Sequence, residues 1–384
     1  MKNKAYILAD NIISPLGFTT AENFERLKKK ETGVKRISDP SLSPEPVCAA
    51  LIDPLRLEAE FKKLGSSERY TRLEKMVILS MNDSIENSGI DIKSKRTLIV
   101  FSTTKGNIDL LDPENAETFD KKRLYLWETA NVIGKYFGNP NTPLVVSNAC
   151  ISGVLAIILG KRLLEGNEYD TIVVTGADIM THFVISGFQS FKAVSSEVAK
   201  PYDAKRDGIS LGEAAGTIIL SNVDPMEGQS VTVLAGSSSN DANHISGPSR
   251  TGDGLFLAIS KAMEESGIGA SDVDFISGHG TATLYNDDME SLAITDAGLA
   301  EVPMNSLKSY FGHTLGAAGI IESVIGLQSL RENTLIGTYN FTELGVPKPV
   351  NILKDTTARQ ADLFLKTAAG FGGCNAAVLF QKTN

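Results

Sequence analysis

Short apolar segments alternate with longer helix-favouring ones along most of the chain. The short segments have strand length and many β-branched residues, whereas the longer ones are rich in Leu, Ile and Ala. The pattern predicts strands at residues 5–8, 97–101, 144–147, 171–174, 217–220, 231–235, 275–277, 364–367 and 377–380. It predicts helices at residues 20–30, 71–88, 153–164, 254–266, 287–298 and 316–330. Such alternation is typical of an α/β protein with largely parallel sheets covered on both faces.

A polar, turn-rich stretch at residues 222–228 follows a predicted strand and is the best candidate for a domain boundary. It divides the chain into residues 1–222 and 223–384, which share a similar rhythm of strands and helices. The rhythm is compatible with a duplicated α/β unit, although no sequence repeat proves it.

The composition changes this picture little. The chain has 384 residues, and its 42% apolar and 22% charged residues are ordinary for a globular protein. A net charge of −9 argues against a general nucleic-acid surface, which needs a basic field. The three cysteines, Cys48, Cys150 and Cys374, lie too far apart for a disulfide framework or a metal knuckle. We expect a reduced, cytoplasmic setting and no bound metal.

Neither a secretory signal nor a membrane span is predicted. Asp10 and Asn11 interrupt the apolar run near the start, and no apolar run approaches the roughly 18–20 residues that cross a bilayer. The sequence therefore predicts a soluble protein without a membrane partner.

Cys150 stands where a predicted strand becomes a predicted helix. A thiol at a helix N-terminus meets unpaired N–H groups and the positive end of the helix dipole, which both favour the thiolate. Cys150 is therefore a candidate nucleophile, although a cysteine is more often a small buried apolar residue.

Two of the four histidines stand in glycine-rich contexts. His279 follows a predicted strand, and His313 precedes a predicted helix. Loops at strand ends commonly carry catalytic groups, so both are candidate partners of Cys150. His182 and His244 lack such a context, and we interpret them as structural residues.

The order of four motifs resembles that of the β-ketoacyl-acyl-carrier-protein synthases. The motifs are Asn-Ala-Cys-Ile-Ser-Gly around Cys150, His-Gly-Thr-Ala-Thr from His279 followed by Asn286-Asp287, Lys308 five residues before His313, and Gly-Phe-Gly-Gly-Cys-Asn at 370–375. Weaker similarity, at residues 13–17 and 200–208, extends the match over nearly the whole chain. The resemblance implies a thiolase fold, with two similar α/β halves in a five-layered αβαβα core, usually as a homodimer.

The resemblance also implies roles for the site residues. Cys150 would hold the growing acyl chain, with the backbone N–H groups of Cys150 and Phe371 as its oxyanion hole. His279 and His313 would stabilise the enolate formed when a malonyl thioester loses carbon dioxide. The product would be a β-ketoacyl chain two carbons longer, as in fatty-acid, polyene or polyketide synthesis.

Further residues would support the two histidines. By resemblance, Lys308 pairs with Glu322, although an ordinary ion pair at a helix edge is the alternative. Asp287 would orient the His279 loop. Thr281 and Thr283 would bind the phosphopantetheine arm, which arrives on the carrier protein, so no separate cofactor is expected; turn capping alone would account for one of the threonines.

An acyl carrier protein is acidic, so docking needs local positive charge. The candidate patch lies ahead of and within one predicted helix, and its alternative is an ordinary solvated helix face. It contains Lys62, Lys63, Arg69, Arg72 and Lys75.

Three residues depart from the family pattern. Ile151, Ile209 and Phe311 stand where the family commonly has residues of another size, which leaves acyl-chain preference open. The main alternative function is a non-catalytic or specificity subunit of a heterodimeric synthase. A thioesterase-type hydrolase is disfavoured, because no Gly-x-Ser-x-Gly motif accompanies a catalytic triad.

Overall fold

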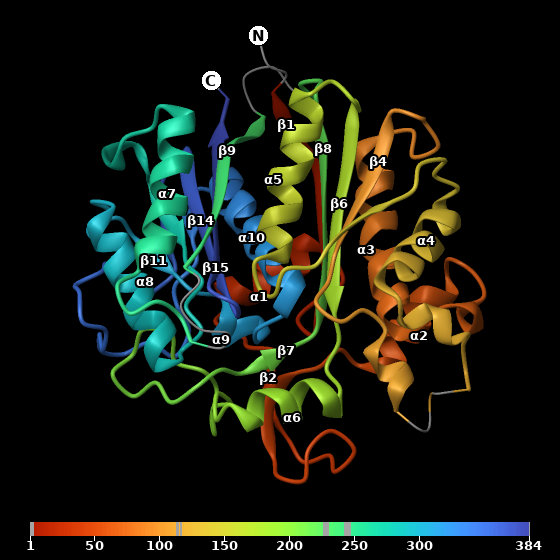
Figure 1. The fold of residues 1–384 in the computed structure, drawn as a ribbon, viewed down its shortest axis with the longest axis horizontal. Helices are drawn as coiled ribbons and strands as arrows, with labels where there is room; N and C mark the ends of the chain where they lie inside the picture. The colour runs from red at the N-terminus through yellow and green to blue at the C-terminus, as the bar shows by residue number, and fades with distance from the viewer. Residues whose placement is uncertain (1–3, 113–114, 116, 226–229, 242–246, 384) are drawn as a thin grey trace.

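The frame of the molecule is a ten-stranded sheet in which two runs of five strands meet at the centre (Figure 1). The computed structural model describes residues 4–112, 115, 117–225, 230–241 and 247–383. The strand order is β11-β10-β14-β15-β9-β1-β8-β6-β4-β5, and the two runs join through β1 and β9.

The sheet strands of the first run are β1 (Ala5–Ile13), β4 (Thr97–Ser102), β5 (Leu144–Val146), β6 (Thr171–Asp178) and β8 (Ala214–Ser221). Those of the second run are β9 (Val231–Asn240), β10 (Phe275–Ser277), β11 (Met304–Asn305), β14 (Leu363–Gly370) and β15 (Cys374–Lys382). Small sheets contain β2 (Val34–Ile37), β3 (Val47–Ala50) and β7 (Leu211–Gly212), and β12 (Thr334–Leu335) and β13 (Thr357–Ala358).

The helices connect these strands. They are α1 (Thr20–Lys28), α2 (Pro54–Lys62), α3 (Arg72–Ser88), α4 (Leu126–Phe137), α5 (Ser152–Glu165), α6 (His182–Ser190), α7 (Asp253–Ser266), α8 (Leu284–Asp296), α9 (Lys308–Phe311) and α10 (Ala318–Glu332). All the strands and helices that the sequence predicts are present, with ends shifted by a few residues.

The two runs of strands have the same topology. Counted along the chain within each run, the order from the centre outward is first, fifth, fourth, second, third. The directions also agree, because the first three neighbouring strands are antiparallel and the outer ones parallel. The fold therefore contains a duplicated α/β unit, and β5–α5 in one half is equivalent to β11–α10 in the other.

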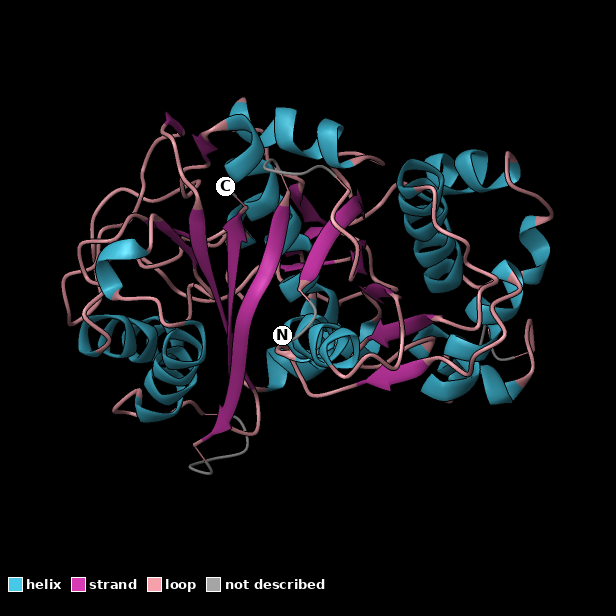
Figure 2. Cartoon of the chain, turned by 90° about the horizontal axis from the view of Figure 1, so that it is seen from above, coloured by secondary structure: helices cyan, strands magenta, loops and turns pink. Residues whose placement is uncertain are grey.

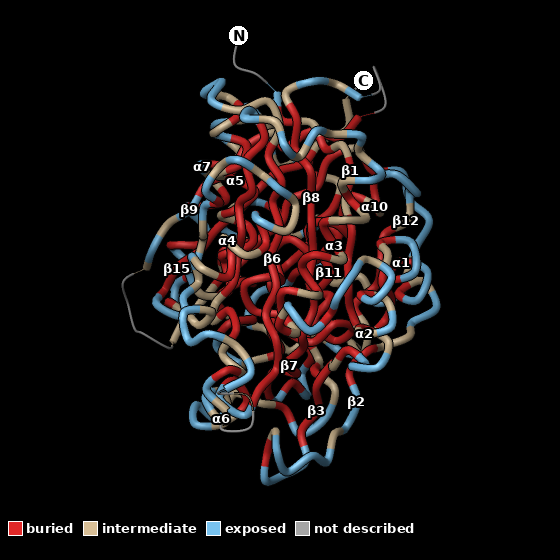
Figure 3. Tube along the Cα trace, turned by 90° about the vertical axis from the view of Figure 1, so that its right-hand side faces the viewer, coloured by how far each residue is buried: buried red, intermediate tan, exposed pale blue. Residues whose placement is uncertain are grey.

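The layers follow from this duplication. Helices α5 and α10 lie between the two halves of the sheet, with α3 and α4 outside one half and α7 and α8 outside the other (Figure 1). Seen from above, helices lie on both outer sides of the strands (Figure 2). The strands β6 and β8 are almost completely buried, whereas exposed backbone is concentrated in the peripheral loops (Figure 3). The expected five-layered thiolase-like fold is confirmed.

The expectation of largely parallel sheets is wrong. Within the ten-stranded sheet the pairs β1–β8, β6–β8, β14–β15, β9–β15 and β1–β9 are antiparallel. A short turn at residues 371–373 joins β14 to β15, and so short a connection permits only antiparallel pairing. The apolar runs of buried antiparallel strands resemble those of parallel strands, so the sequence did not distinguish them.

The two halves share one apolar core. One buried cluster includes residues of α5 and β6 from the first half and of α10 and β14 from the second. The division into residues 1–222 and 223–384 stays a prediction, and part of its proposed boundary lies outside the described residues. No helix in the described part of the chain is long and apolar enough to cross a membrane.

Candidate active site

Cys150 lies in a strained turn between β5 and α5. The preceding residue, Ala149, has a left-handed backbone with φ of +45°, which costs energy in a residue that has a side chain. The Ser152 hydroxyl donates to the Ala149 carbonyl at 2.6 Å and accepts from the Asn148 N–H at 2.8 Å. These bonds hold the turn, so the thiol is fixed just before the first turn of α5.

The resting thiol is protonated. Burial raises the pKa of Cys150 to about 11, although the positive charges of Lys105 and Lys308 and the backbone N–H of Phe371 oppose this rise. The expectation that the helix N-terminus favours the thiolate therefore needs correction, since burial has the larger effect. Attack on a thioester must remove the proton as the new bond forms.

The backbone around Phe371 approaches the Cys150 turn closely. A Cβ on Gly370 would lie only 3.1 Å from the Cys150 nitrogen, so the two loops are in close contact there. The Phe371 N–H bonds to the Cys150 sulfur. Two backbone donors thus converge beside the thiol, which is the arrangement that an oxyanion hole needs.

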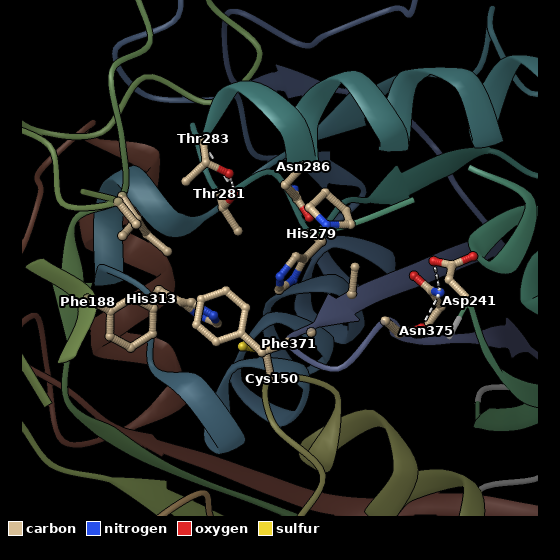
Figure 4. A pocket seen from close by; sticks show the side chains of 16 residues that line it. Cys150, Phe188, Asp241, His279, Thr281, Thr283, Asn286, His313, Phe371 and Asn375 are labelled. Carbon is tan, nitrogen blue, oxygen red and sulfur yellow. Dashed lines mark hydrogen bonds between the residues drawn. The ribbon is translucent and has the colours of Figure 1, made fainter. Parts of the chain in front are cut away.

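The histidines face Cys150 and each other (Figure 4). Their ring centroids are 5.3 Å apart, and the Cys150 sulfur and one nitrogen of each ring all lie within 4.8 Å of one another. His279 and His313 are 2% and 1% exposed, and Nδ1 of each has no hydrogen-bond partner in the structure. The same three atoms would also suit a soft divalent metal ion. The expectation of no metal stays a prediction.

Both imidazoles are neutral. Burial lowers the pKa of His279 well below its usual range, followed by the charge of Lys308, the neighbouring His313 and the charge of Lys366. Burial, Lys308, Lys105 and Lys366 lower the pKa of His313 in the same way. Neutral rings with unpaired nitrogens can donate to an oxyanion without leaving a buried charge at rest.

Carboxylates hold the His279 loop from behind. Asp287 accepts from the N–H groups of Thr281 at 2.9 Å and Ala282 at 3.1 Å, and burial raises the pKa of Asp287 to about 6. Glu290 accepts the His279 N–H at 2.7 Å. The interpretation of Asp287 therefore agrees with these contacts. Glu290 was missed, although its place one helical turn after Asp287 was a usable signal.

The His313 loop is held by backbone contacts and by another carboxylate. The His313 N–H donates to the Ser210 carbonyl at 2.7 Å. Gly312 has φ of +67°, and a Cβ there would lie 2.3 Å from the Leu211 carbonyl oxygen. Asp178, at the end of β6, accepts from the N–H groups of Gly316 at 2.7 Å and Thr104 at 2.9 Å. Asp178 therefore links the two halves of the site, and no sequence pattern pointed to it.

The predicted pair of Lys308 and Glu322 is present. The Lys308 ammonium lies 2.6 Å from Glu322 Oε1, and both side chains are buried. An ordinary ion pair at an exposed helix edge does not describe this geometry. The other oxygen of Glu322 lies 2.5 Å from Lys366, which was missed in the sequence.

A cavity with both polar and apolar walls opens on the histidine side of Cys150. Its polar side chains include Thr281, Thr283 and Asn286 together with both histidines. The hydroxyls of Thr281 and Thr283 are hydrogen-bonded to each other at 2.8 Å, as Figure 4 shows. Their place on the cavity wall suits contact with a polar substrate arm.

A second, apolar cavity opens on the other side of Cys150. Residues of α6 form much of its wall, including Phe183, Val184, Gly187 and Phe188. Phe188 and Phe371 line both cavities, and their rings stack with 5.6 Å between centroids. The sequence did not predict α6 and so did not predict this cavity.

Three family departures have different locations. Ile209 lines the cavity on the histidine side of Cys150. Ile151 and Phe311 are buried in the main apolar core, and neither lines the two cavities around Cys150 in the described part of the chain. They can affect the acyl site only through the packing beneath it.

The other two histidines and Cys374 are accounted for as follows. His182 is exposed, with its Nδ1 3.2 Å from the Leu42 carbonyl, and His244 lies outside the described residues. Cys374 is buried close to Cys150, and its thiol donates to the Phe371 carbonyl at 3.3 Å.

The predicted carrier-protein patch is largely neutralised by internal ion pairs. Arg72 pairs with the buried Glu213, and Lys75 lies 2.7 Å from Glu58. Lys62 and Lys63 also have acidic partners within 4.0 Å. Arg72 must therefore be corrected from a docking charge to an internal one. Of the five patch residues, only Arg69 is exposed with no ion pair to another described residue.

A cysteine beside a helix N-terminus, two neutral histidines and converging backbone donors within a thiolase-like fold define a condensing acyltransferase. Comparison with known proteins then specifies the family. The chain belongs to the β-ketoacyl synthase family, whose N-terminal domain profile matches residues 4–226 and whose C-terminal domain profile matches residues 230–342.

Several relatives of this chain are named 3-oxoacyl-[acyl-carrier-protein] synthase 2. The 3-oxoacyl-[acyl-carrier-protein] synthase 2 of Rhizobium meliloti is 30% identical over 259 residues, which cover 63% of this chain and 61% of that protein. The protein of the same name from Vibrio cholerae is 24% identical over 99% of both chains. A solved ketosynthase in complex with its chain length factor, from Xenorhabdus doucetiae, is 25% identical with a TM-score of 0.89, covering 99% of this chain and 98% of that one.

Proposed function

We propose that the protein extends an acyl chain, delivered as a carrier-protein thioester, by two carbons through decarboxylative condensation with a malonyl thioester. The observation that carries this proposal is the convergence of the Cys150 sulfur with one nitrogen of each histidine within 4.8 Å. The names of the relatives, which are carrier-protein synthases, support the substrate class.

The first half-reaction loads the enzyme. The Cys150 sulfur bonds to the acyl carbonyl carbon, the bond from that carbon to the phosphopantetheine sulfur breaks, and the departing arm takes the proton. The N–H groups of Cys150 and Phe371 stabilise the oxyanion formed on the way. The apolar cavity beside α6 receives the acyl chain.

The second half-reaction forms the new bond. A malonyl thioester, with its arm along Thr281 and Thr283, places its carbonyl oxygen between His279 and His313. Loss of carbon dioxide leaves its electron pair on the enolate, which the two ring N–H groups stabilise. The carbanion attacks the acyl carbon on Cys150, and the carbon–sulfur bond breaks to release the β-ketoacyl product.

A partner chain is part of the proposal. Leu144 is 39% exposed on β5, an edge strand of the ten-stranded sheet. Tyr125 and Trp127 are also exposed, at the start of α4, which packs against β5. These residues suit pairing with a second copy of the chain. Pairing with a paralogue is the alternative, since the Xenorhabdus ketosynthase forms a complex with a chain length factor. We place the protein in the cytoplasm, where its three free thiols stay reduced.

One experiment tests the function. The purified protein is incubated with carrier proteins bearing a range of acyl groups, and intact mass identifies the group retained on Cys150. We expect labelling of the native protein and none of Cys150→Ala. Malonyl-carrier protein is then added, and a β-ketoacyl product two carbons longer is expected.

The outcomes separate the two candidate functions. Labelling of Cys150→Ala would overturn the assignment of the nucleophile. No turnover alone, but turnover after addition of a paralogue, would favour the specificity subunit.

A further inference from the structure

Lys366 is an unusual residue for the middle of a sheet. It lies in β14, and its side chain has no exposed surface. Its ammonium group donates to the carbonyls of Ser277 at 3.2 Å and Gly278 at 3.0 Å, and lies 2.5 Å from Glu322. Burying a lysine costs several kcal/mol unless partners compensate for lost water, so this placement calls for a specific role.

Glu322 is shared between two lysines. Lys308 lies 2.6 Å from one of its oxygens, and Lys366 lies 2.5 Å from the other. Glu290 is a second buried carboxylate that acts on Lys366. Both ammonium groups nevertheless lower the pKa of both histidines.

Lys366 also fixes the peptide that leads into His279. It holds the carbonyls of the two preceding residues, while Glu290 holds the N–H of His279 itself. A Cβ on Gly278 would lie 2.3 Å from both Met304 and Tyr202, so this peptide has little room to move. The imidazole thus stands on a backbone that is held from both sides.

We propose that Lys366 is a positioning residue for the decarboxylation step, because it holds the backbone that carries His279 and shares Glu322 with Lys308 behind both imidazoles. The proposal rests on the proposed function. It assigns Lys366 no contact with substrate, so loading of Cys150 does not depend on it.

The charge of Lys366 affects how the rate of decarboxylation depends on pH. The groups facing His279 are Lys308, Lys366, His313 and Cys150, with Glu290 on its backbone. Removing one cation raises the pKa of His279 toward its usual range. An imidazolium would give its proton to the enolate and quench the carbanion, so the acid limb of the rate profile should move to higher pH.

The test compares Lys366→Met with Lys366→Gln in the full-length protein. The methionine removes the charge and the donor, whereas the glutamine keeps an amide donor for the two carbonyls. Lys382→Met, a partly exposed lysine on the neighbouring strand β15, is the matched control. Carbon dioxide release from malonyl-carrier protein is measured from about pH 5 to pH 8, where a histidine charge change is visible.

For Lys366→Met we expect carbon dioxide release to fall about tenfold or more, because small displacements of a catalytic group are costly. Lys366→Gln should recover part of this rate, both variants should shift the acid limb upward, and acylation of Cys150 should stay within about twofold of the native protein. An unchanged rate and pH profile in both variants would overturn the proposal, as would a parallel loss of acylation.

A second readout separates this inference from the proposed function. The titration of the His279 ring is followed by NMR, with the signal assigned by its loss in His279→Gln. Its pKa should rise in both Lys366 variants and not in Lys382→Met. If the native protein releases no carbon dioxide, the proposed function fails, and the titration alone decides whether Lys366 acts on His279.

Discussion

The two sides of Cys150 differ in chemistry. On the histidine side, Asp287, Glu290 and Glu322 hold loops through buried hydrogen bonds and ion pairs. On the other side, the wall contributed by α6 is mainly aromatic and aliphatic. Under the proposed function, the side that stabilises charge is held by buried polar contacts, whereas the side that receives the acyl chain offers apolar volume.

The difference has a structural origin. Cys150 lies between β5 and α5, and His313 lies between β11 and α10, the equivalent elements of the duplicated unit. The same geometry therefore presents the proposed nucleophile in one half and a proposed hydrogen-bond donor in the other. The loop between β6 and β8 contains α6, whereas the equivalent connection from β14 to β15 is a short turn.

The largest effect is expected for Glu322→Gln. The change leaves two buried ammonium groups without their carboxylate, so the free energy of unfolding should fall by about 3–5 kcal/mol. Urea unfolding measures this loss. Glu332→Gln on the same helix is the control, since its ion pair with Lys28 is exposed and should contribute at most about 1 kcal/mol. Equal losses in the two variants would contradict the importance of the buried cluster.

The histidines provide the next test. His279→Ala and His313→Ala should each lower carbon dioxide release by about 10²–10³-fold, because each removes a preorganised donor to the enolate. Loading of Cys150 should persist, and His182→Ala should behave like the native protein. If acylation of Cys150 falls as strongly as carbon dioxide release, the two histidines are not specific to the second half-reaction.

The apolar side is tested by Gly187→Leu. A Cβ at Gly187 meets no atom within 4 Å, so a larger side chain can occupy the cavity without disturbing the helix. Long acyl groups should lose about tenfold in loading rate while short ones load normally. Competition between acyl-carrier proteins, read by intact mass, measures the ratio. Ser190→Leu on the same helix is the control, and an unchanged ratio would place the acyl chain elsewhere.

The smallest effect is expected for Lys105→Met. Lys105 lowers the raised pKa of Cys150, so its loss should raise that pKa further above about 11. Below this pKa the thiolate fraction grows about tenfold per pH unit, and the variant should react with iodoacetamide about threefold more slowly near pH 8. Peptide mass mapping isolates modification at Cys150. Lys121→Met is the exposed control, and an unchanged rate would show that Lys105 does not act on the thiol.

The sequence by itself made Cys150, His279 and His313 candidates, and the family resemblance added the pair of Lys308 with Glu322. The structure brings the first three together and contains the ion pair, while their catalytic roles stay a prediction. The sequence also predicted every strand of the ten-stranded sheet except β11, which is only two residues long. Among the helices of nine or more residues it missed α2, α4 and α6.

Only the tertiary structure decided what surrounds these residues. In the sequence, Lys366 is only a charged residue within an apolar strand. Its proposed role depends on Glu322, 44 positions away, and on two backbone carbonyls at the end of β10. The contacts of Asp178 with Gly316 and of Arg72 with Glu213 likewise join distant segments. The pKa of Cys150 also depends on the packed molecule. Burial raises this pKa, and its effect is larger than that of the nearby helix N-terminus. Local motifs specify which atoms react, whereas long-range packing sets their charge state and position.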